Sequence, residues 1–144
     1  MAGRSYVVFR TQKLSTMQEV GAAGKHIERT RPIRNADPDR LLDNERLAGS
    51  GDLMADVQAR LDTLDRIRAN AIRAVEYVLG ASKEWFDAAR AEEIAAWRDR
   101  SMAWLRQTHG AENVVAAVFH KDELTPHIQA VVVPIDERGK LGSE

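Results

Sequence analysis

The 144-residue sequence contains no cysteine, which excludes disulfide bonds, zinc–thiolate sites and a thiol nucleophile. It also lacks any apolar run near the ~20 residues of a membrane-spanning helix, and its N-terminus lacks the apolar core of a signal peptide. The formal net charge is −1, so the chain has no bulk basicity that would attract nucleic acid. We therefore expect a cytoplasmic protein.

The residues that are present favour one domain with an uneven charge distribution. Hydrophobic residues make up 44% of the chain, enough for a core of ordinary size. In residues 1–34 two acids, Glu19 and Glu28, stand against seven basic residues: Arg4, Arg10, Lys13, Lys25, Arg29, Arg31 and Arg34. This first quarter of the chain is a candidate anion-facing region.

Residues 120–129 contain two imidazoles, two carboxylates and an amide within ten positions and read H-K-D-E-L-T-P-H-I-Q. The β-branched runs on either side predict a hairpin with strands at about 113–119 and 126–133. Because side chains alternate along a strand, His127 and Gln129 point the same way, and His120 lies across from His127. With Glu123 above them in the loop, these side chains form a candidate site for Mn, Mg or Zn.

The rest of the chain mixes strands and helices. A β-branched run predicts a strand at 4–12, and the ambiguous stretch 72–81 is also interpreted as a strand. Helices are expected at about 15–23, 52–64 and 82–108, the second capped by Asp52 and the third broken near Ala91. Residues 24–40 are expected to be irregular and rich in loops. The order predicts an α+β fold, an antiparallel sheet backed by helices, with Trp85, Trp97 and Trp104 in the core and Tyr6 and Tyr77 as packing residues.

Three blocks of sequence, in order, resemble a single family. The first is the run 5–13 followed by Lys25-His-Ile-Glu-Arg29, which is similar to an N-terminal strand and an H-x-E-R motif. The second is Asn35-Ala-Asp-Pro-Asp-Arg40 followed by Asn44, and the third, 120–127, matches H-x-D-E-x-T-P-H at every fixed position. The chain thus resembles the plasmid mobilisation relaxases of the Pre/Mob (MobV) type, within the HUH endonucleases.

The resemblance implies an enzyme that nicks one strand of DNA at an origin of transfer, stays attached to the 5′ phosphate, and later rejoins the strand. It implies His26 as the nucleophile with Arg29 beside it for the phosphate. His120 and His127 become ligands of a divalent metal, Mn or Mg, and Glu123 a ligand or its close support. Further DNA contacts would come from Lys25, Arg31, Arg34, Arg40 and Asn44.

Two departures from the family pattern affect these expectations. The family continues P-H-x-H, whereas this chain has Gln129 at the last position. This is the HUQ variant among HUH enzymes, and an amide oxygen still suits a hard cation. Glu45 stands where the family often has a tyrosine, which removes one alternative nucleophile and favours His26. Family members also continue further, so 1–144 would be a single relaxase catalytic domain, shortened at its C-terminus and lacking regions that could form a homodimer.

Other interpretations remain open at this point. The histidines of the hairpin could be hydrogen-bonded residues of a polar loop, and His26 an exposed loop residue. Within the same fold, the chain could be a rolling-circle replication initiator or a DNA-binding module without catalysis, an option that Gln129 keeps open. A metal-dependent hydrolase of small phosphates is disfavoured by the basic first quarter, which suggests an extended polyanion.

Overall fold

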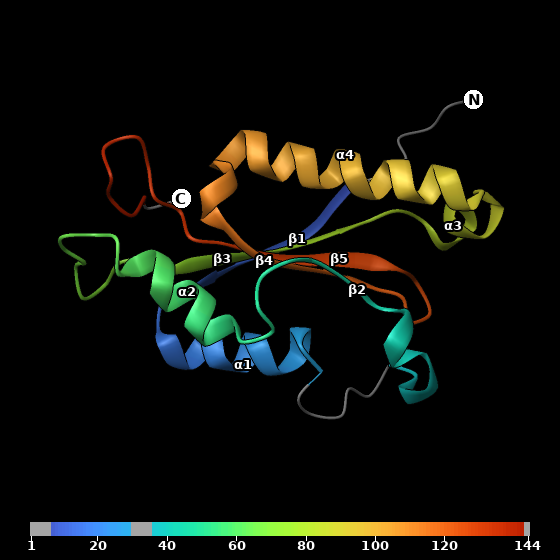
Figure 1. Ribbon diagram of the computed structural model, residues 1–144, viewed down its shortest axis with the longest axis horizontal. Coiled ribbons are helices and arrows are strands. Elements are labelled where there is room, and N and C mark those ends of the chain that lie inside the picture. The colour runs from blue at the N-terminus through green and yellow to red at the C-terminus, as the bar shows by residue number, and fades with distance from the viewer. Residues whose placement is uncertain (1–6, 30–35, 143–144) are drawn as a thin grey trace.

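The computed structural model describes residues 7–29 and 36–142 and shows a twisted sheet with helices on both faces (Figure 1). Five antiparallel strands are ordered β1-β3-β5-β4-β2. The strands are β1 (Val7–Leu14), β2 (Glu45–Ala48), β3 (Ala74–Gly80), β4 (Val114–His120) and β5 (His127–Val132). The helices are α1 (Met17–Ile27), α2 (Leu53–Leu61), α3 (Lys83–Ala88) and α4 (Ala91–His109), with 3-10 turns η1 (Pro38–Asp43) and η2 (Ala111–Asn113). The predicted α+β class is confirmed.

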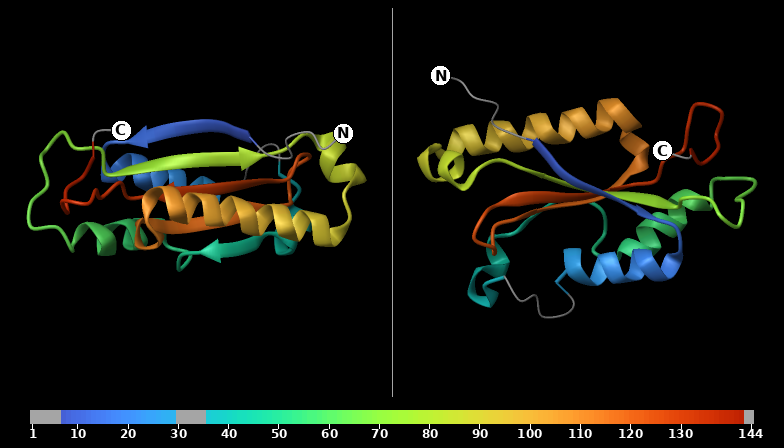
Figure 2. Two further views of the ribbon diagram at one scale, coloured as in Figure 1. Left: turned by 90° about the horizontal axis from the view of Figure 1, so that it is seen from above. Right: turned by 180° about the vertical axis from the view of Figure 1, so that it is seen from behind.

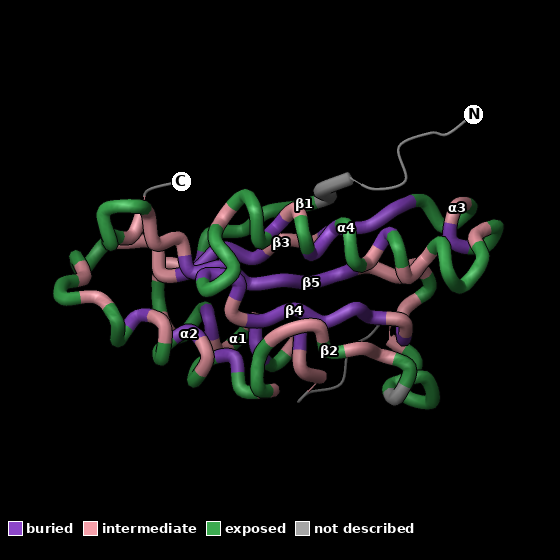
Figure 3. Tube along the Cα trace, turned by 45° about the horizontal axis from the view of Figure 1, so that its top comes forward, coloured by how far each residue is buried: buried purple, intermediate pink, exposed green. Residues whose placement is uncertain are grey.

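The sheet separates two cores, because alternate side chains of its strands point to opposite faces. Helices α1 and α2 cover one face, where Val20 and Val57 pack with Val131. Helices α3 and α4 cover the other, where Trp97 packs with Ile128 (Figure 2). The two central strands β4 and β5 are buried along nearly their whole length (Figure 3).

The aromatic residues occupy the core on the α4 side, as predicted. Trp97 is fully buried, and Trp85 and Trp104 are partly buried against the same cluster. Tyr77 packs edge-on against Trp104, with ring centroids 6.3 Å apart, while Tyr6 lies outside the described residues. These rings therefore serve packing.

Helix α1 is longer than the sequence predicts, and this corrects the expected irregular segment at 24–26. Thr16 caps its first turn by accepting a hydrogen bond from the Glu19 N–H at 3.1 Å. Gly24 does not end the helix but lets it approach α2, since a Cβ at Gly24 would lie 3.1 Å from the Leu53 Cβ. The helix continues to Ile27, so Lys25 and His26 lie in its last turn.

The remaining predictions of secondary structure hold with one exception, the edge strand β2. The capping of α2 by Asp52 is confirmed, since its carboxylate accepts from the Ala55 N–H. The short edge strand β2 was not predicted, because its sequence Glu-Arg-Leu-Ala has no β-branched residue. The break expected near Ala91 in the predicted helix 82–108 is confirmed, since this segment forms two helices that meet at Ala89 and Arg90. Within the described ranges, no helix is long and apolar enough to cross a membrane.

Candidate active site

The site lies at the end of the β4–β5 hairpin, on the face of the sheet that α1 covers. His120 and His127 are directly paired across the two strands, and their ring centroids are 5.3 Å apart. Gln129 follows two residues along β5 and projects to the same face, whereas Ile128 is buried in the opposite core. The predicted convergence of these three side chains is confirmed by the strand register.

Two members of this group, His120 and Gln129, are buried and have polar atoms without protein partners. His120 is 0% exposed and Gln129 2%, yet both ring nitrogens of His120 and Oε1 of Gln129 have no hydrogen-bond partner among the described residues. An unsatisfied buried polar atom costs about 1–3 kcal/mol. Such atoms persist where a bound group completes their bonding.

His127 is oriented by the hairpin itself. Its Nδ1 lies 3.0 Å from the carbonyl oxygen of Thr125, to which it can donate only when Nδ1 carries the proton. Nε2 then keeps its lone pair, as a metal-binding imidazole requires. Two imidazole nitrogens and one amide oxygen are a donor set that fits a divalent cation.

The protonation state of His120 agrees with that donor set. Burial, followed by the positive charge of Arg29, lowers the pKa of His120 to about 3. The ring is therefore neutral near pH 7 and can present a lone pair. In the described part of the chain, no three His, Asp or Glu side chains are grouped to hold a metal. The amide of Gln129 is a further oxygen donor in the cavity that His127 lines.

Glu123 lies beside the two histidines, and its contacts are those of a supporting residue. Its Oε2 accepts a hydrogen bond from Nη2 of Arg29 at 2.7 Å and lies 3.4 Å from Nε2 of His127. Of the two roles expected for Glu123, these contacts match the support of the ligands more closely than direct ligation.

Arg29 does not project into the cleft as the sequence suggested. Its Nε and Nη2 donate to the two carboxylate oxygens of Asp122 at 2.8 and 2.9 Å, and Nη2 also reaches Glu123. The Arg29 side chain is only 6% exposed. With its fork engaged by protein carboxylates, Arg29 ties the end of α1 to the hairpin loop, and the phosphate contact expected from the sequence stays a prediction. Asp122, its main partner, was not predicted.

The contacts between Arg29 and Asp122 also determine the pKa of Asp122. Burial alone would raise the pKa of Asp122, but the hydrogen bonds and charge of Arg29 outweigh it and hold that pKa below its ordinary value. Asp122 is thus ionised at neutral pH. Arg29 adopts a positive φ of 57°, a conformation that is costly for a non-glycine residue and that surrounding contacts have to maintain.

Asn44 supports the same loop from the other side. Its side-chain oxygen accepts hydrogen bonds from the backbone N–H groups of Lys121 at 2.6 Å and Asp122 at 3.1 Å. The N–H of Asp37 donates to the Asp122 carbonyl at 2.6 Å. The oxygen of Asn44 is therefore engaged in holding the hairpin loop, and the DNA contact expected from the sequence stays a prediction.

Of the other basic residues predicted to contact DNA, the structure describes Lys25 and Arg40. Lys25 is exposed in the last turn of α1. Arg40 is exposed on η1 and donates to Asp43 at 3.3 Å. Arg31 and Arg34 lie outside the described residues.

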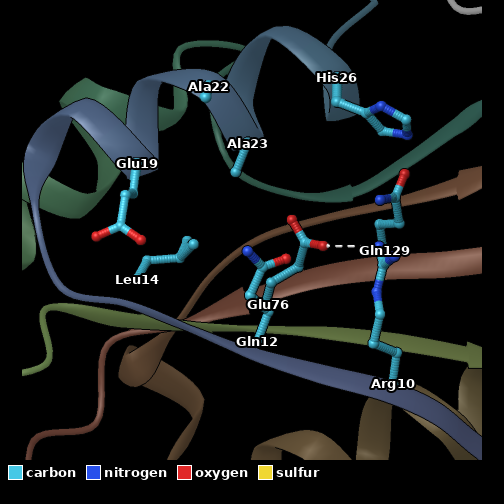
Figure 4. A pocket seen from close by; sticks show the side chains of 9 residues that line it. All are labelled: Arg10, Gln12, Leu14, Glu19, Ala22, Ala23, His26, Glu76 and Gln129. Atoms are coloured by element: carbon cyan, nitrogen blue, oxygen red, sulfur yellow. Dashed lines mark hydrogen bonds and ion pairs between the residues drawn. The ribbon is translucent and has the colours of Figure 1, made fainter.

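His26 lines the cleft that also contains the metal-type donors. Two adjoining cavities of about 310 and 770 Å³ share Arg10, His26 and Gln129, and the larger one also contains His127 and Glu123. Figure 4 shows the imidazole of His26 and the amide of Gln129 extending toward the same space from α1 and β5. The fold thus unites residues about a hundred positions apart in the chain.

The cleft also contains polar residues that were not predicted as site residues, among them Arg10 and Gln12 on β1 and Glu76 on β3. Glu76 is 5% exposed, and burial raises its pKa despite the nearby charge of Arg10. In the sequence, Glu76 is the one charged residue of the apolar strand β3, whereas Arg10 and Gln12 belong to the continuous polar run 10–13 of β1. Only the pairing of β1 with β3 shows that they meet.

His109 is the last residue of α4. A charged histidine there would interact favourably with the helix dipole. Burial instead lowers the pKa of His109, which favours its neutral form, and its ring packs 5.1 Å from that of Tyr77. It belongs to the packing on the α4 side, away from the cleft.

The sequence of the chain matches one protein family and is similar to two curated proteins. Residues 4–144 match the Mob_Pre family, described as plasmid recombination enzyme. The chain is 37% identical to the "65 kDa protein" of Zymomonas mobilis, with 96% of this chain and 25% of that protein covered. It is 29% identical to the plasmid recombination enzyme of Streptococcus agalactiae, with 97% of this chain and 30% of that protein covered.

Solved structures show the same fold. The relaxase domain of MobM, bound to Mn and to 22-nucleotide origin-of-transfer (oriT) DNA of plasmid pMV158, superposes with a TM-score of 0.82 at 25% identity. A second structure of that domain, with DNA carrying a 3′ thiophosphate, gives 0.83 at 26%. Each comparison covers 96% of this chain and 74% of the other. The chain thus spans most of that relaxase domain but under a third of the two curated relatives described above.

Proposed function

The chain belongs to the Mob_Pre family of plasmid recombination enzymes, and from this premise we propose that residues 1–144 are the catalytic domain of a plasmid mobilisation relaxase. Its substrate is origin-of-transfer DNA, single-stranded at the nick. The observation that carries the proposal is the shared cleft, in which His26 from α1 lines the same space as His127 and Gln129 from β5.

His120, His127 and Gln129 are the residues that hold the divalent metal, Mn or Mg. The fit rests on the buried, unpartnered ring nitrogens of His120 and Oε1 of Gln129, and on the neutral state of His120. When bound, the cation neutralises charge on the non-bridging oxygens of the phosphate. Glu123 supports the site through its contacts with His127 and Arg29.

His26 acts as the nucleophile. A lone pair on its neutral imidazole forms a P–N bond to the scissile phosphorus, and the bond from phosphorus to the 3′ oxygen breaks. The 3′ oxygen takes up a proton, and the imidazole releases one from its other nitrogen, so charge and atoms balance. The phosphoramidate on the 5′ phosphate is reversed when a 3′ hydroxyl attacks, which is the joining step.

Arg29 and Asn44 position this chemistry. Arg29 donates to Asp122 and Glu123 in the hairpin loop and also to the backbone carbonyl of His26 at 3.0 Å. One guanidinium therefore links the backbone of the nucleophile to the metal hairpin. Lys25, Arg40, Arg31 and Arg34 provide the phosphate contacts along the strand, which fix its position without reading its sequence.

The test uses single-stranded oligonucleotides with a label at each end, tiled across the DNA that flanks the gene, together with the 22-nucleotide pMV158 DNA. The wild-type chain with Mn²⁺ is expected to produce a cut, a free 3′ hydroxyl on the upstream fragment and a covalent adduct with the 5′ phosphate of the downstream fragment. His26→Ala is expected to form no adduct. His127→Ala is expected to lose most of the cleavage activity, and its residual activity should no longer depend on Mn²⁺.

Other outcomes point to other functions. Binding without any cut or adduct across the panel would show a DNA-binding module of the same fold. An adduct that persists in His26→Ala would move the nucleophile to a tyrosine. Specific nicking at a replication origin, with none at a transfer origin, would show a rolling-circle initiator.

A further inference from the structure

Arg10 and Glu76 form an ion pair inside the cleft, on neighbouring strands of the sheet. Nη2 of Arg10 on β1 donates to Oε1 of Glu76 on β3 at 3.3 Å. Figure 4 shows the side chain of Arg10 extending from β1 toward the amide of Gln129, below the ring of His26. The guanidinium therefore stands between its carboxylate partner and the residues proposed to act on the phosphate.

The two partners differ in exposure in a way that assigns them different roles. The side chain of Glu76 is 7% exposed, whereas that of Arg10 is 59% exposed. Among the described residues that line the two cavities, Arg10 is the only lysine or arginine. The anion is buried under the sheet face, and the cation is presented to the cleft.

Arg29 does not provide this charge, despite its place in the H-x-E-R motif. Its side chain is 6% exposed and faces the carboxylates of Asp122 and Glu123. The Arg29 guanidinium cannot reorient toward a ligand without leaving the two carboxylates unpaired, which costs several kcal/mol. A phosphate at His26 and Gln129 therefore needs a different cation.

We propose that Arg10 binds the non-bridging oxygens of the phosphate next to His26, and that Glu76 positions Arg10 for this contact. The inference rests on the proposed function in that the ligand is the phosphate of the DNA strand. Guanidinium carries five N–H donors in a planar fork, so a bond to Glu76 leaves others for a bidentate phosphate contact. The buried carboxylate restricts a long side chain that would otherwise lose rotamer entropy on binding.

The test compares Arg10→Gln, Arg10→Lys, Glu76→Gln and the Arg10→Gln/Glu76→Gln double variant, with Arg100→Gln as control. Arg100 is exposed on α4, across the sheet from the cleft. Two quantities are measured for each: the salt dependence of binding to a labelled single-stranded oligonucleotide, and the single-turnover cleavage rate with Mn²⁺. Circular dichroism and melting curves verify that each variant is folded.

Arg10→Gln is expected to lower the slope of log K against log salt by about 0.7, the loss of one phosphate contact on single-stranded DNA. Its cleavage rate falls by roughly 10- to 100-fold, the loss of a charged hydrogen bond. Arg10→Lys keeps the slope but recovers only part of the rate, since a point charge replaces the fork. Glu76→Gln keeps the slope and slows cleavage, and adds nothing further in the double variant.

The outcomes separate this inference from the proposed function. If Arg10→Gln keeps both the wild-type slope and the wild-type rate, Arg10 does not bind the phosphate. An additive loss in the double variant would show that Glu76 acts on stability and not through Arg10. If the wild-type chain does not cleave, the nuclease proposal fails, and the salt slope still decides whether Arg10 is a phosphate contact.

Discussion

Arg29 and Asp122 join the two halves of the candidate site, with Nε and Nη2 of the arginine 2.8 and 2.9 Å from the two carboxylate oxygens. The arginine follows the helix that carries His26, and the aspartate follows the strand that ends at His120. Because the pair is nearly inaccessible to solvent, it fixes the relation between the proposed nucleophile and the proposed metal ligands.

Removing one partner of this pair is expected to be strongly destabilising. Asp122→Asn leaves the Arg29 guanidinium buried without a full counter-charge, at a cost of about 3–5 kcal/mol. Urea unfolding measures the loss. As a matched control, Asp136→Asn removes the partner of exposed Arg138, and an exposed pair of this kind contributes ~0–1 kcal/mol. Equal losses in the two variants would contradict the assigned role of Asp122.

The two glycines of α1 are expected to respond oppositely to alanine. At Gly24 the new Cβ meets the Leu53 Cβ at 3.1 Å, so overpacking of about 1–3 kcal/mol exceeds the helix-propensity gain of up to ~1 kcal/mol. At Gly21 it meets the sulfur of the exposed Met54 at 3.0 Å, which can move aside. Melting temperatures should fall for Gly24→Ala and stay level or rise for Gly21→Ala. A rise for both would show that α1 and α2 are not in close contact.

Gln129→His is expected to tighten metal binding. A third imidazole nitrogen replaces an amide oxygen, and transition metals favour that exchange. Calorimetric titration with Mn²⁺ should give a dissociation constant lower by about tenfold, with a larger gain for Zn²⁺. Gln107→His, on the exposed face of α4, is the control and should leave metal affinity unchanged. No change in Gln129→His would remove residue 129 from the ligand set.

Glu76→Gln is expected to change how stability depends on pH. Burial raises the pKa of Glu76 in the folded chain above its ordinary value of 4.5. The folded state therefore binds more protons than the unfolded state in this range, and stability decreases as pH rises from 4.5 through the folded-state pKa. Melting curves between pH 4 and 8 should show the advantage of Glu76→Gln over wild type growing with pH. A constant difference would mean that the carboxylate does not titrate on folding.

The sequence predicts the hairpin half of the site well, because that half depends on local rules. Alternation along the strands places His127 and Gln129 on one face, and the loop between the strands brings His120 opposite His127. The apolar stripe of α2 and its Asp52 cap were predicted from the same kind of spacing and are observed.

The other half depends on contacts between distant residues, and sequence patterns are weakest there. Glycine at positions 21 and 24 suggests a helix break, but both positions face α2, where small residues allow close packing. The partners of Arg29 lie 93 and 94 residues away, and those of Arg10 and Glu76 depend on the pairing of β1 with β3. None of these pairings leaves a local periodicity to detect.

The central claim is that His26 attacks the DNA phosphate while the β4–β5 hairpin holds the metal. Its most direct test is mass spectrometry of the protein after incubation with a cleavable single-stranded oligonucleotide and Mn²⁺, followed by proteolysis. The account predicts a nucleotide adduct on the peptide that contains His26, labile in acid as a phosphoramidate is, and absent from His26→Ala. An adduct on any other residue, or one that survives acid, would contradict it.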